Sequence, residues 1–301
     1  WRKAMPEGPV VVLDADADAE ILGALWPGRG VEMVRAELRP VADVTQVTDR
    51  AFSKRALLGL DGAGGEELRA ELVGLVRLEV LRQRAEGGDG VLAVASKAVV
   101  KQIFADAGQE KVSLGDELHG ASWAWYGPAT RGLNDWRGFG AVVLIGREEL
   151  PPDALTGQAR ALYGDGAEAL DLPQKNAAGA LIAPEAALPV LMADGSARAV
   201  VGRAYADRRL RALQMQSRER GLRQAAERLR LAHADSPKRV LVLSRVPVPG
   251  LPVSQLVTWD SLAPDRLHRA MAEAALRTGI LRTSAAGLAA DAPETFPSPN
   301  A

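Results

Sequence analysis

Short runs of consecutive apolar residues constrain the fold of this chain more than any other feature. These runs are residues 9–13, 90–95, 141–145 and 238–244. A run that is apolar at successive positions is typical of a strand covered on both faces of a parallel sheet. Residues 31–36 and 43–48 alternate and predict two shorter strands, and residues 66–84 repeat leucine and valine at helical spacing. The sequence therefore predicts an α/β fold with a parallel sheet between layers of helices.

Composition excludes several kinds of site and protein class but does not identify the function. Of the 301 residues 47% are hydrophobic and 25% are charged, as in an ordinary globular protein, and the net charge is −1. The absence of cysteine excludes disulfides, thiol catalysis and thiolate metal sites. The three histidines, His119, His233 and His268, are far apart in sequence and indicate no metal site. No apolar stretch has transmembrane length, so we expect a cytoplasmic protein with no membrane partner.

The turn before the run at 141–145 carries residues suited to phosphate, namely Thr130, Arg131, Gly132 and Asn134. Glycine lets the backbone approach a phosphate closely, and the threonine and arginine side chains can donate to its oxygens. This turn resembles motif V of superfamily 2 helicases, where it precedes a strand of the second RecA-like domain. The resemblance implies that these four residues bind nucleic acid. The alternative is an ordinary connection from loop to strand.

Ser96 and Lys97 follow the run at 90–95 and begin a predicted helix. Backbone N–H groups at the start of a helix favour an anion, and Ser96 could instead cap the helix. This position is similar to helicase motif IV, which implies a second contact to nucleic acid. Residues 9–13 likewise lead into Asp14 and Asp16, similar to motif III although Asp16 stands in place of threonine. That likeness implies coupling between ATP hydrolysis and movement on DNA, whereas a plain turn capped by aspartate is the alternative.

The segment 198–230 holds ten arginines against three acidic residues. Within it, Gln224, Arg228 and Arg230 resemble motif VI, Gln-x-x-Gly-Arg-x-x-Arg, with Glu227 in place of the glycine and the second arginine one position early. The resemblance implies that Arg228, with Arg230, is an arginine finger for ATP and that Gln224 orients phosphate or water. A charged, solvated helix face is the alternative.

The four likenesses occur in the order III, IV, V, VI, and together they resemble the carboxy-terminal RecA-like half of a superfamily 2 DNA helicase of the phage and plasmid helicase–primase kind. Neither a G-x-x-x-x-G-K-[ST] loop nor a metal-holding acidic box is present; Asp116–His119 has the letters of such a box but lacks the buried strand before it. The resemblance thus implies ATP and Mg²⁺ only together with an N-terminal ATP-binding domain, and single-stranded DNA as partner. Because the sequence opens on Trp1, we expect that domain upstream or in another chain.

The resemblance divides the chain into three parts. Residues 1–44 would end a first RecA-like domain and its linker, residues 45–257 would form the second RecA-like domain, and residues 258–301 would add a helical extension and a weakly ordered tail. Two other functions stay open. One is a non-catalytic nucleic-acid-binding module built on the arginine-rich helix. The other is a metabolic α/β enzyme with an acidic, magnesium-dependent site at Asp14 and Asp16.

Overall fold

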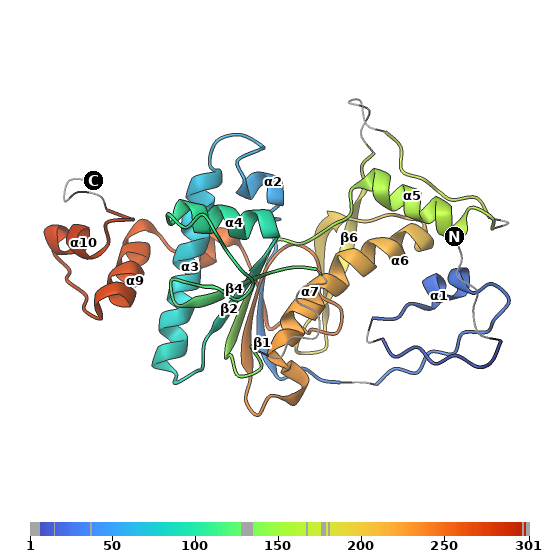
Figure 1. Ribbon diagram of the computed structural model, residues 1–301, viewed down its shortest axis with the longest axis horizontal. Coiled ribbons are helices and arrows are strands. Elements are labelled where there is room, and N and C mark those ends of the chain that lie inside the picture. Colours follow the sequence, from blue (N-terminus) through green and yellow to red (C-terminus); the bar gives the residue numbers. More distant parts are fainter. Residues whose placement is uncertain are drawn as a thin grey trace.

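A seven-stranded sheet forms the centre of the molecule (Figure 1). The computed structural model describes residues 7–14, 16–36, 38–127, 135–166, 168–175, 179, 181–296 and 298. The strands are β1 (Ala42–Val47), β2 (Val91–Ala95), β3 (Glu117–Leu118), β4 (Ala121–Trp125), β5 (Ala141–Ile145), β8 (Lys238–Leu243) and β9 (Gln255–Val257). Their order is β3-β4-β2-β5-β8-β1-β9, and only β3 runs antiparallel to its neighbour. An α/β fold with a mostly parallel sheet is confirmed, and it is compatible with the RecA-like class.

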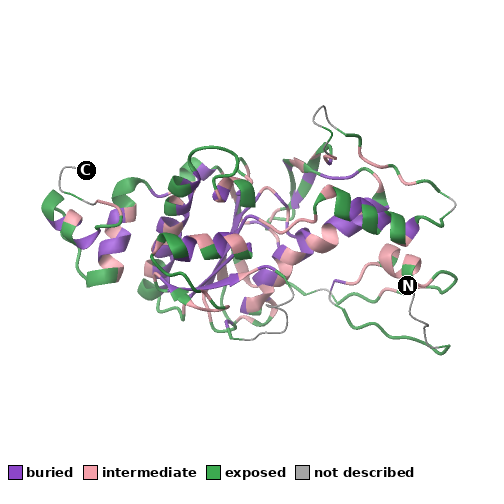
Figure 2. Cartoon of the chain, turned by 45° about the horizontal axis from the view of Figure 1, so that its top comes forward, coloured by how far each residue is buried: buried purple, intermediate pink, exposed green. Residues whose placement is uncertain are grey.

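The pleat of the strands separates the core into two hydrophobic layers. One layer contains Ala93 and Val143 and packs against α3 (Gly65–Ala85) and α4 (Lys97–Asp106). The other contains Leu92 and Val142 and packs against α7 (Glu219–Ala226). Every position of β2 and β5 is buried, which explains why these sequences are apolar throughout rather than alternating (Figure 2).

The connections between strands change direction between β2 and β5. From β1 the chain moves through α3 to β2 and through α4 to β4, toward one edge of the sheet. From β5 it moves the other way, to β8. That connection contains α5 (Pro152–Tyr163), β6 (Glu185–Leu191), β7 (Ala197–Arg203), α6 (Arg208–Ser217), α7, and the short helices η2 (Glu227–Leu229) and η3 (Leu231–His233). In open α/β sheets ligands bind beside such a point, at the carboxyl ends of the strands.

Helical units lie at the two ends of the long axis (Figure 1). At one end α1 (Ala19–Leu25) packs against α5 and α6. At the other end α9 (Arg266–Thr278) packs on α3 and also holds α10 (Ala285–Asp291). The short helices α2 (Lys54–Leu57) and α8 (Trp259–Leu262) lie closer to the sheet. None of the helices in the described ranges combines the length and apolar content that crossing a bilayer requires.

Several predicted elements are confirmed and others are wrong. The strands at 90–95, 141–145 and 238–244 and the helix at 66–84 are present as β2, β5, β8 and α3. The predicted strand at 9–13 is not formed: the segment has no regular secondary structure and is exposed, with Leu13 at 94% exposure, and no strand among the described residues pairs with it. Residues 31–36 form no strand either. The strand predicted at 43–48 is present as β1, which begins at Ala42. Part of the expected tail forms α10.

Candidate functional site at the carboxyl edge of the sheet

Ser96 and Lys97 lie where β2 ends and α4 begins, directly at the change of direction. Ser96 occupies the N-cap position, yet its hydroxyl makes no capping hydrogen bond. The side chain is buried, at 5% exposure, and Oγ has no partner among the described atoms. The N–H groups of the first turn of a helix also have no partner within the helix. This corner therefore combines a buried hydroxyl that has no partner among the described atoms with an exposed lysine.

Two aromatic side chains at the end of β4 support this corner. The ammonium of Lys97 lies 4.8 Å from the centre of the Trp125 ring, a distance that favours a cation–π contact. Tyr126 is buried and its hydroxyl contacts the carbonyl oxygens of Ile145 and Gly146, at 3.3 and 3.4 Å. The ends of β2, β4 and β5 are thus held together.

The turn after β5 adds charged residues to the same edge. Gly146 has a φ of +65°, and a Cβ there would lie 2.3 Å from the carbonyl oxygen of Phe52, so this close approach requires glycine. Arg147 Nη2 then pairs with Glu149 Oε2 at 2.9 Å. Burial raises the pKa of Glu148, while the positive charge of Lys54 opposes the shift. Both signs of charge therefore follow the carboxyl end of β5, the strand paired with β2.

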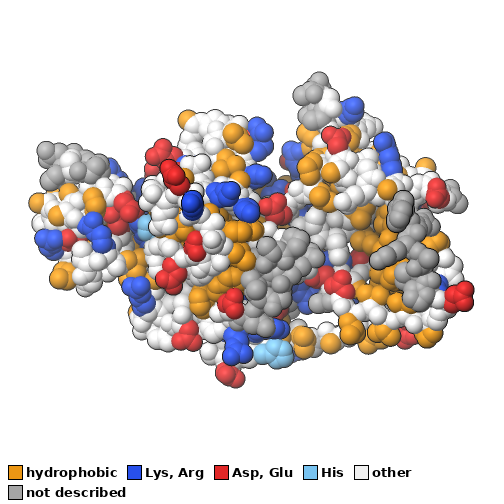
Figure 3. Space-filling view, viewed as in Figure 1, with side chains coloured by type: hydrophobic (Ala, Val, Ile, Leu, Met, Phe, Trp, Pro, Cys, Tyr) orange, Lys and Arg blue, Asp and Glu red, His pale blue; other side chains and the backbone are white. Residues whose placement is uncertain are grey.

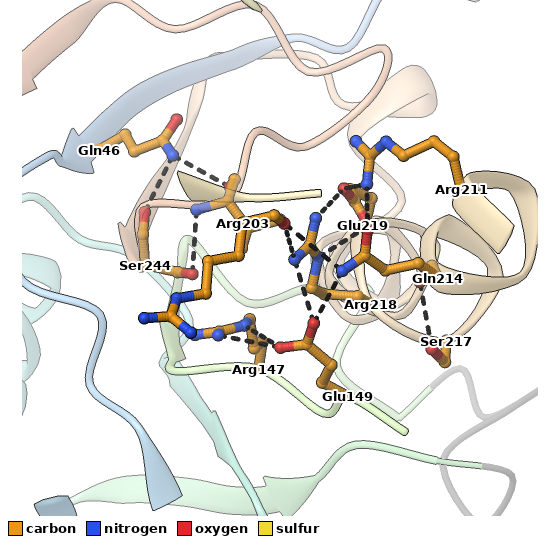
Figure 4. A network of polar contacts seen from close by, with 11 residues as sticks. Gln46, Arg147, Glu149, Arg203, Arg211, Gln214, Ser217, Arg218, Glu219 and Ser244 are labelled. Atoms are coloured by element: carbon orange, nitrogen blue, oxygen red, sulfur yellow. Dashed lines mark hydrogen bonds and ion pairs between the residues drawn. The ribbon is translucent and has the colours of Figure 1, made fainter. Parts of the chain in front are cut away.

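A buried polar network ties this turn to the junction of α6 and α7 (Figure 4). Arg218, 1% exposed, donates to both carboxylate oxygens of Glu219, to Glu149 Oε1 at 3.1 Å and to the carbonyl of Arg203 at 2.7 Å. Arg211 pairs with Glu219 at 2.7 Å. Burial raises the pKa of Glu219, but the hydrogen bonds and charges of Arg218 and Arg211 outweigh it and leave that pKa below its usual range. The network holds the junction of α6 and α7 against the turn that follows β5.

The ends of β1 and β8 complete the row of polar groups. Gln46 Nε2 donates to the carbonyl oxygens of Ser244 and Val246, at 2.9 and 3.0 Å (Figure 4). Two further buried atoms have no partner among the described atoms, Gln46 Oε1 and Arg245 Nε. Buried polar groups are nearly always paired, so three such atoms along one edge, with Ser96 Oγ, indicate a place where a polar ligand binds. Sequence reasoning missed Arg147 and Arg245, although each follows a strand end.

The acidic segment near the amino terminus docks on α7. Asp16 is buried, and its Oδ2 accepts from Gln224 Nε2 at 2.6 Å. Asp14 Oδ1 accepts from the backbone N–H of Asp16 at 2.9 Å, and Arg220 pairs with Asp18 at 2.6 Å. The structure thus brings Asp16, but not Asp14, into contact with Gln224, and the contacts of Asp16 and Asp18 hold this segment to α7.

Arg228 and Arg230 lie at the opposite edge of the sheet from Ser96. The segment after α7 reaches the amino ends of β1 and β8: Lys238 Nζ donates to the carbonyl of Leu229 at 2.9 Å, and the N–H of Val41 donates to that of Leu231 at 2.9 Å. Arg228, in η2, donates from Nε to the carbonyl of Gln224 in α7 at 3.2 Å. Ser96 and Lys97, which resemble motif IV, and the two arginines that resemble motif VI therefore lie at opposite edges of the sheet and do not share one cleft.

Thr130, Arg131, Gly132 and Asn134 lie outside the described residues. Two of the nearby tryptophans are core residues: Trp123 is fully buried, and Trp136 Nε1 donates to Ser122 Oγ at 2.9 Å. Among the described residues no group of three or more histidine, aspartate or glutamate side chains is placed to hold a metal ion.

Comparisons with known proteins leave the family open. No family model, no curated protein and no solved structure matches this chain. The assignment of a function therefore rests on the geometry of the carboxyl edge.

Proposed function

We propose that this chain is an α/β nucleic-acid-binding domain that holds the phosphate backbone of a single strand at the carboxyl edge of its sheet. The observation that carries the proposal is the buried, unpartnered hydroxyl of Ser96 at the start of α4, beside the exposed ammonium of Lys97. Hydroxyl, backbone N–H and ammonium groups are the donors with which proteins hold phosphate. Trp125 next to Lys97 is half-buried and offers one face to a base.

The more specific role is a second candidate, the carboxy-terminal motor half of a superfamily 2 helicase. The mostly parallel sheet with helices on both faces favours it. In that role ATP and Mg²⁺ would be held by a separate N-terminal domain, and this chain would supply part of the DNA grip. The position of Arg228 at the amino edge argues against its use as the arginine finger in the same cleft as Ser96.

Binding of a labelled oligothymidine, measured by fluorescence anisotropy over a series of salt concentrations, tests the proposal. Lys97→Ala should weaken binding about tenfold and should lower the salt slope by about 0.7, the value for one lost phosphate contact. Lys101→Ala is the matched control, because Lys101 is exposed on the same helix one turn further from the edge. Equal affinities of wild type, Lys97→Ala and Lys101→Ala would refute the proposal.

A further inference from the structure

A cavity of about 920 Å³ lies away from the carboxyl edge, between α3, the end of α4, α9 and the turn at 294–295. Its volume is within the range of small-molecule sites. Figure 3 shows acidic and basic side chains on both sides of the junction where the α9–α10 unit meets the body of the domain. Four arginines line the cavity, two from α3 (Arg69 and Arg77) and two from α9 (Arg266 and Arg269).

The two arginines of α3 differ in how their charges are satisfied. Each of the three side-chain nitrogens of Arg69 already donates, two of them to the carboxylate oxygens of Asp106 and one to the carbonyl of Leu57. Arg77, 5% exposed, pairs with Glu294, contacts His119 Nδ1 at 3.0 Å and lies 3.7 Å from Glu273. Burial, and then the charge of Arg77, lowers the pKa of His119 to about 4, so this histidine adds no charge at neutral pH.

The carboxylate of Glu294 can leave Arg77 without unfolding the segment that carries it. Its side chain is 58% exposed, although the arginine it contacts is buried. The turn itself is held by Glu273, which accepts from the backbone N–H groups of Glu294 and Thr295 and from Thr295 Oγ1. Rotation of one side chain into solvent would therefore release Nη2 of Arg77 from this carboxylate, while Nη1 stays 3.7 Å from Glu273.

The arginines of α9 have donors to spare. Arg266 donates to the carbonyl of Thr295 at 3.2 Å and lies over the ring of Phe296, and it has no carboxylate partner among the described residues. Arg269 Nε is buried and has no hydrogen-bond partner among the described residues. Arg269 Nη2 pairs with the exposed Glu67 at 2.6 Å. Unused guanidinium donors in a cavity are the feature that recognises phosphate and carboxylate groups.

The geometry points to a second ligand site in this cavity, for a small molecule with several anionic groups. One phosphate or carboxylate group takes the place of Glu294 on Arg77, and the others reach Arg266 and Arg269. The Glu294 carboxylate then occupies the position of a ligand anion on Arg77, and the ligand displaces it. The site is separate from the carboxyl edge, because His119 and Asp106 belong to the amino end of β4 and the carboxyl end of α4.

Isothermal titration calorimetry with pyrophosphate and, separately, with citrate tests this site. Glu294→Gln should tighten binding of the preferred anion about tenfold, because it removes the competing charge and keeps the shape. Arg266→Gln should weaken binding about tenfold, and Arg277→Gln, on α9 but outside the cavity lining, should leave it unchanged. All three positions are exposed or partly exposed, so these variants should fold.

The two probes separate the ligand sources. Binding of pyrophosphate alone indicates a phosphorylated ligand, binding of citrate alone indicates a polycarboxylate, and binding of both supports the shared anion site. Absence of binding to wild type and to Glu294→Gln would overturn the inference, and so would an Arg266→Gln variant with wild-type affinity. The Lys97→Ala variant should bind the anion as wild type does. The test of the anion site is therefore independent of the proposed nucleic-acid function.

Discussion

At the scale of single residues, a buried hydroxyl without a partner is the most informative feature of this chain. A serine at the N-cap of a helix normally accepts a hydrogen bond from the first turn, as Ser53 does at α2 and Ser284 at α10. Ser96 does not, although it is buried. Among the described residues its hydroxyl has no hydrogen-bond partner, and we propose a bound ligand as that partner.

We therefore predict that Ser96→Ala separates binding from stability. The free energy of unfolding should change by less than about 0.5 kcal/mol, because no hydrogen bond is lost, while oligothymidine affinity falls. Ser122→Ala is the control: its Oγ donates to Gly115 and accepts from Trp136, so this variant should lose about 1–3 kcal/mol and keep its affinity. Urea denaturation and anisotropy measure the two quantities. Loss of stability in Ser96→Ala with unchanged affinity would show a structural role instead.

Glu148 gives a prediction about pH. Burial raises its pKa in the folded state, so folding favours the protonated form, and the stability linked to this group is present at low pH and lost as pH rises through the folded pKa. Glu148→Gln removes this cost. The variant should be more stable than wild type at neutral pH, and the difference should disappear below about pH 4, near the usual pKa of glutamate. Denaturation midpoints across this range test the sign, and a variant less stable than wild type at neutral pH would contradict it.

At the scale of elements, the strands show what the sequence could predict. β2 and β5 are covered on both faces, so five buried positions leave an apolar run that identifies them. Residues 9–13 have the same pattern without a neighbouring strand, which sequence alone does not reveal. The hairpin of β6 and β7 was missed although Asp194-Gly195, a common hairpin turn, joins two partly alternating segments.

The candidate site was predicted in part for the same reason. Ser96 and Lys97 follow a recognisable strand, so their place at its carboxyl end could be predicted. The pairing of Glu149 with Arg218 could not, because these residues are 69 positions apart and meet only through the bend between α6 and α7.

That bend leads to a prediction for α6 and α7. Arg218→Ala removes the bidentate partner of the buried Glu219 and leaves this carboxylate paired with Arg211 alone, so the loss should be about 1.5–3 kcal/mol, the usual range for hydrogen bonds to a charged group. Arg82→Ala breaks an exposed pair with Glu86 and should cost less than about 1 kcal/mol. Urea denaturation of both variants measures the contrast, and similar losses in the two would show that the network does not hold the helices together.

At the scale of the whole molecule, the sheet keeps the two sets of candidate residues apart. Parallel strands of five or six residues separate the edge at Ser96 from the edge at Arg228 by roughly 15–20 Å at about 3.3 Å per residue. α7 and η2 together span about this distance, from the Arg218 network at the carboxyl edge to Leu229 beside Lys238 at the amino edge. A phosphate held by Lys97 is therefore out of reach of Arg228.

The last prediction follows from this separation. Arg228→Ala should keep wild-type affinity for oligothymidine and the same salt slope. Lys97→Ala should lower both the affinity and the slope, because in our proposal the nucleic acid binds at the carboxyl edge, to which Lys97 belongs and Arg228 does not. The chain alone should hydrolyse no ATP, since its sequence has no loop that cradles the β- and γ-phosphates. If Arg228→Ala loses affinity as strongly as Lys97→Ala, the nucleic-acid path crosses the amino edge instead. Steady-state ATPase measurements with and without oligothymidine complete the test. ATP hydrolysis by this chain alone, stimulated by oligothymidine, would contradict the prediction, because it would require a nucleotide site that we assign to neither edge.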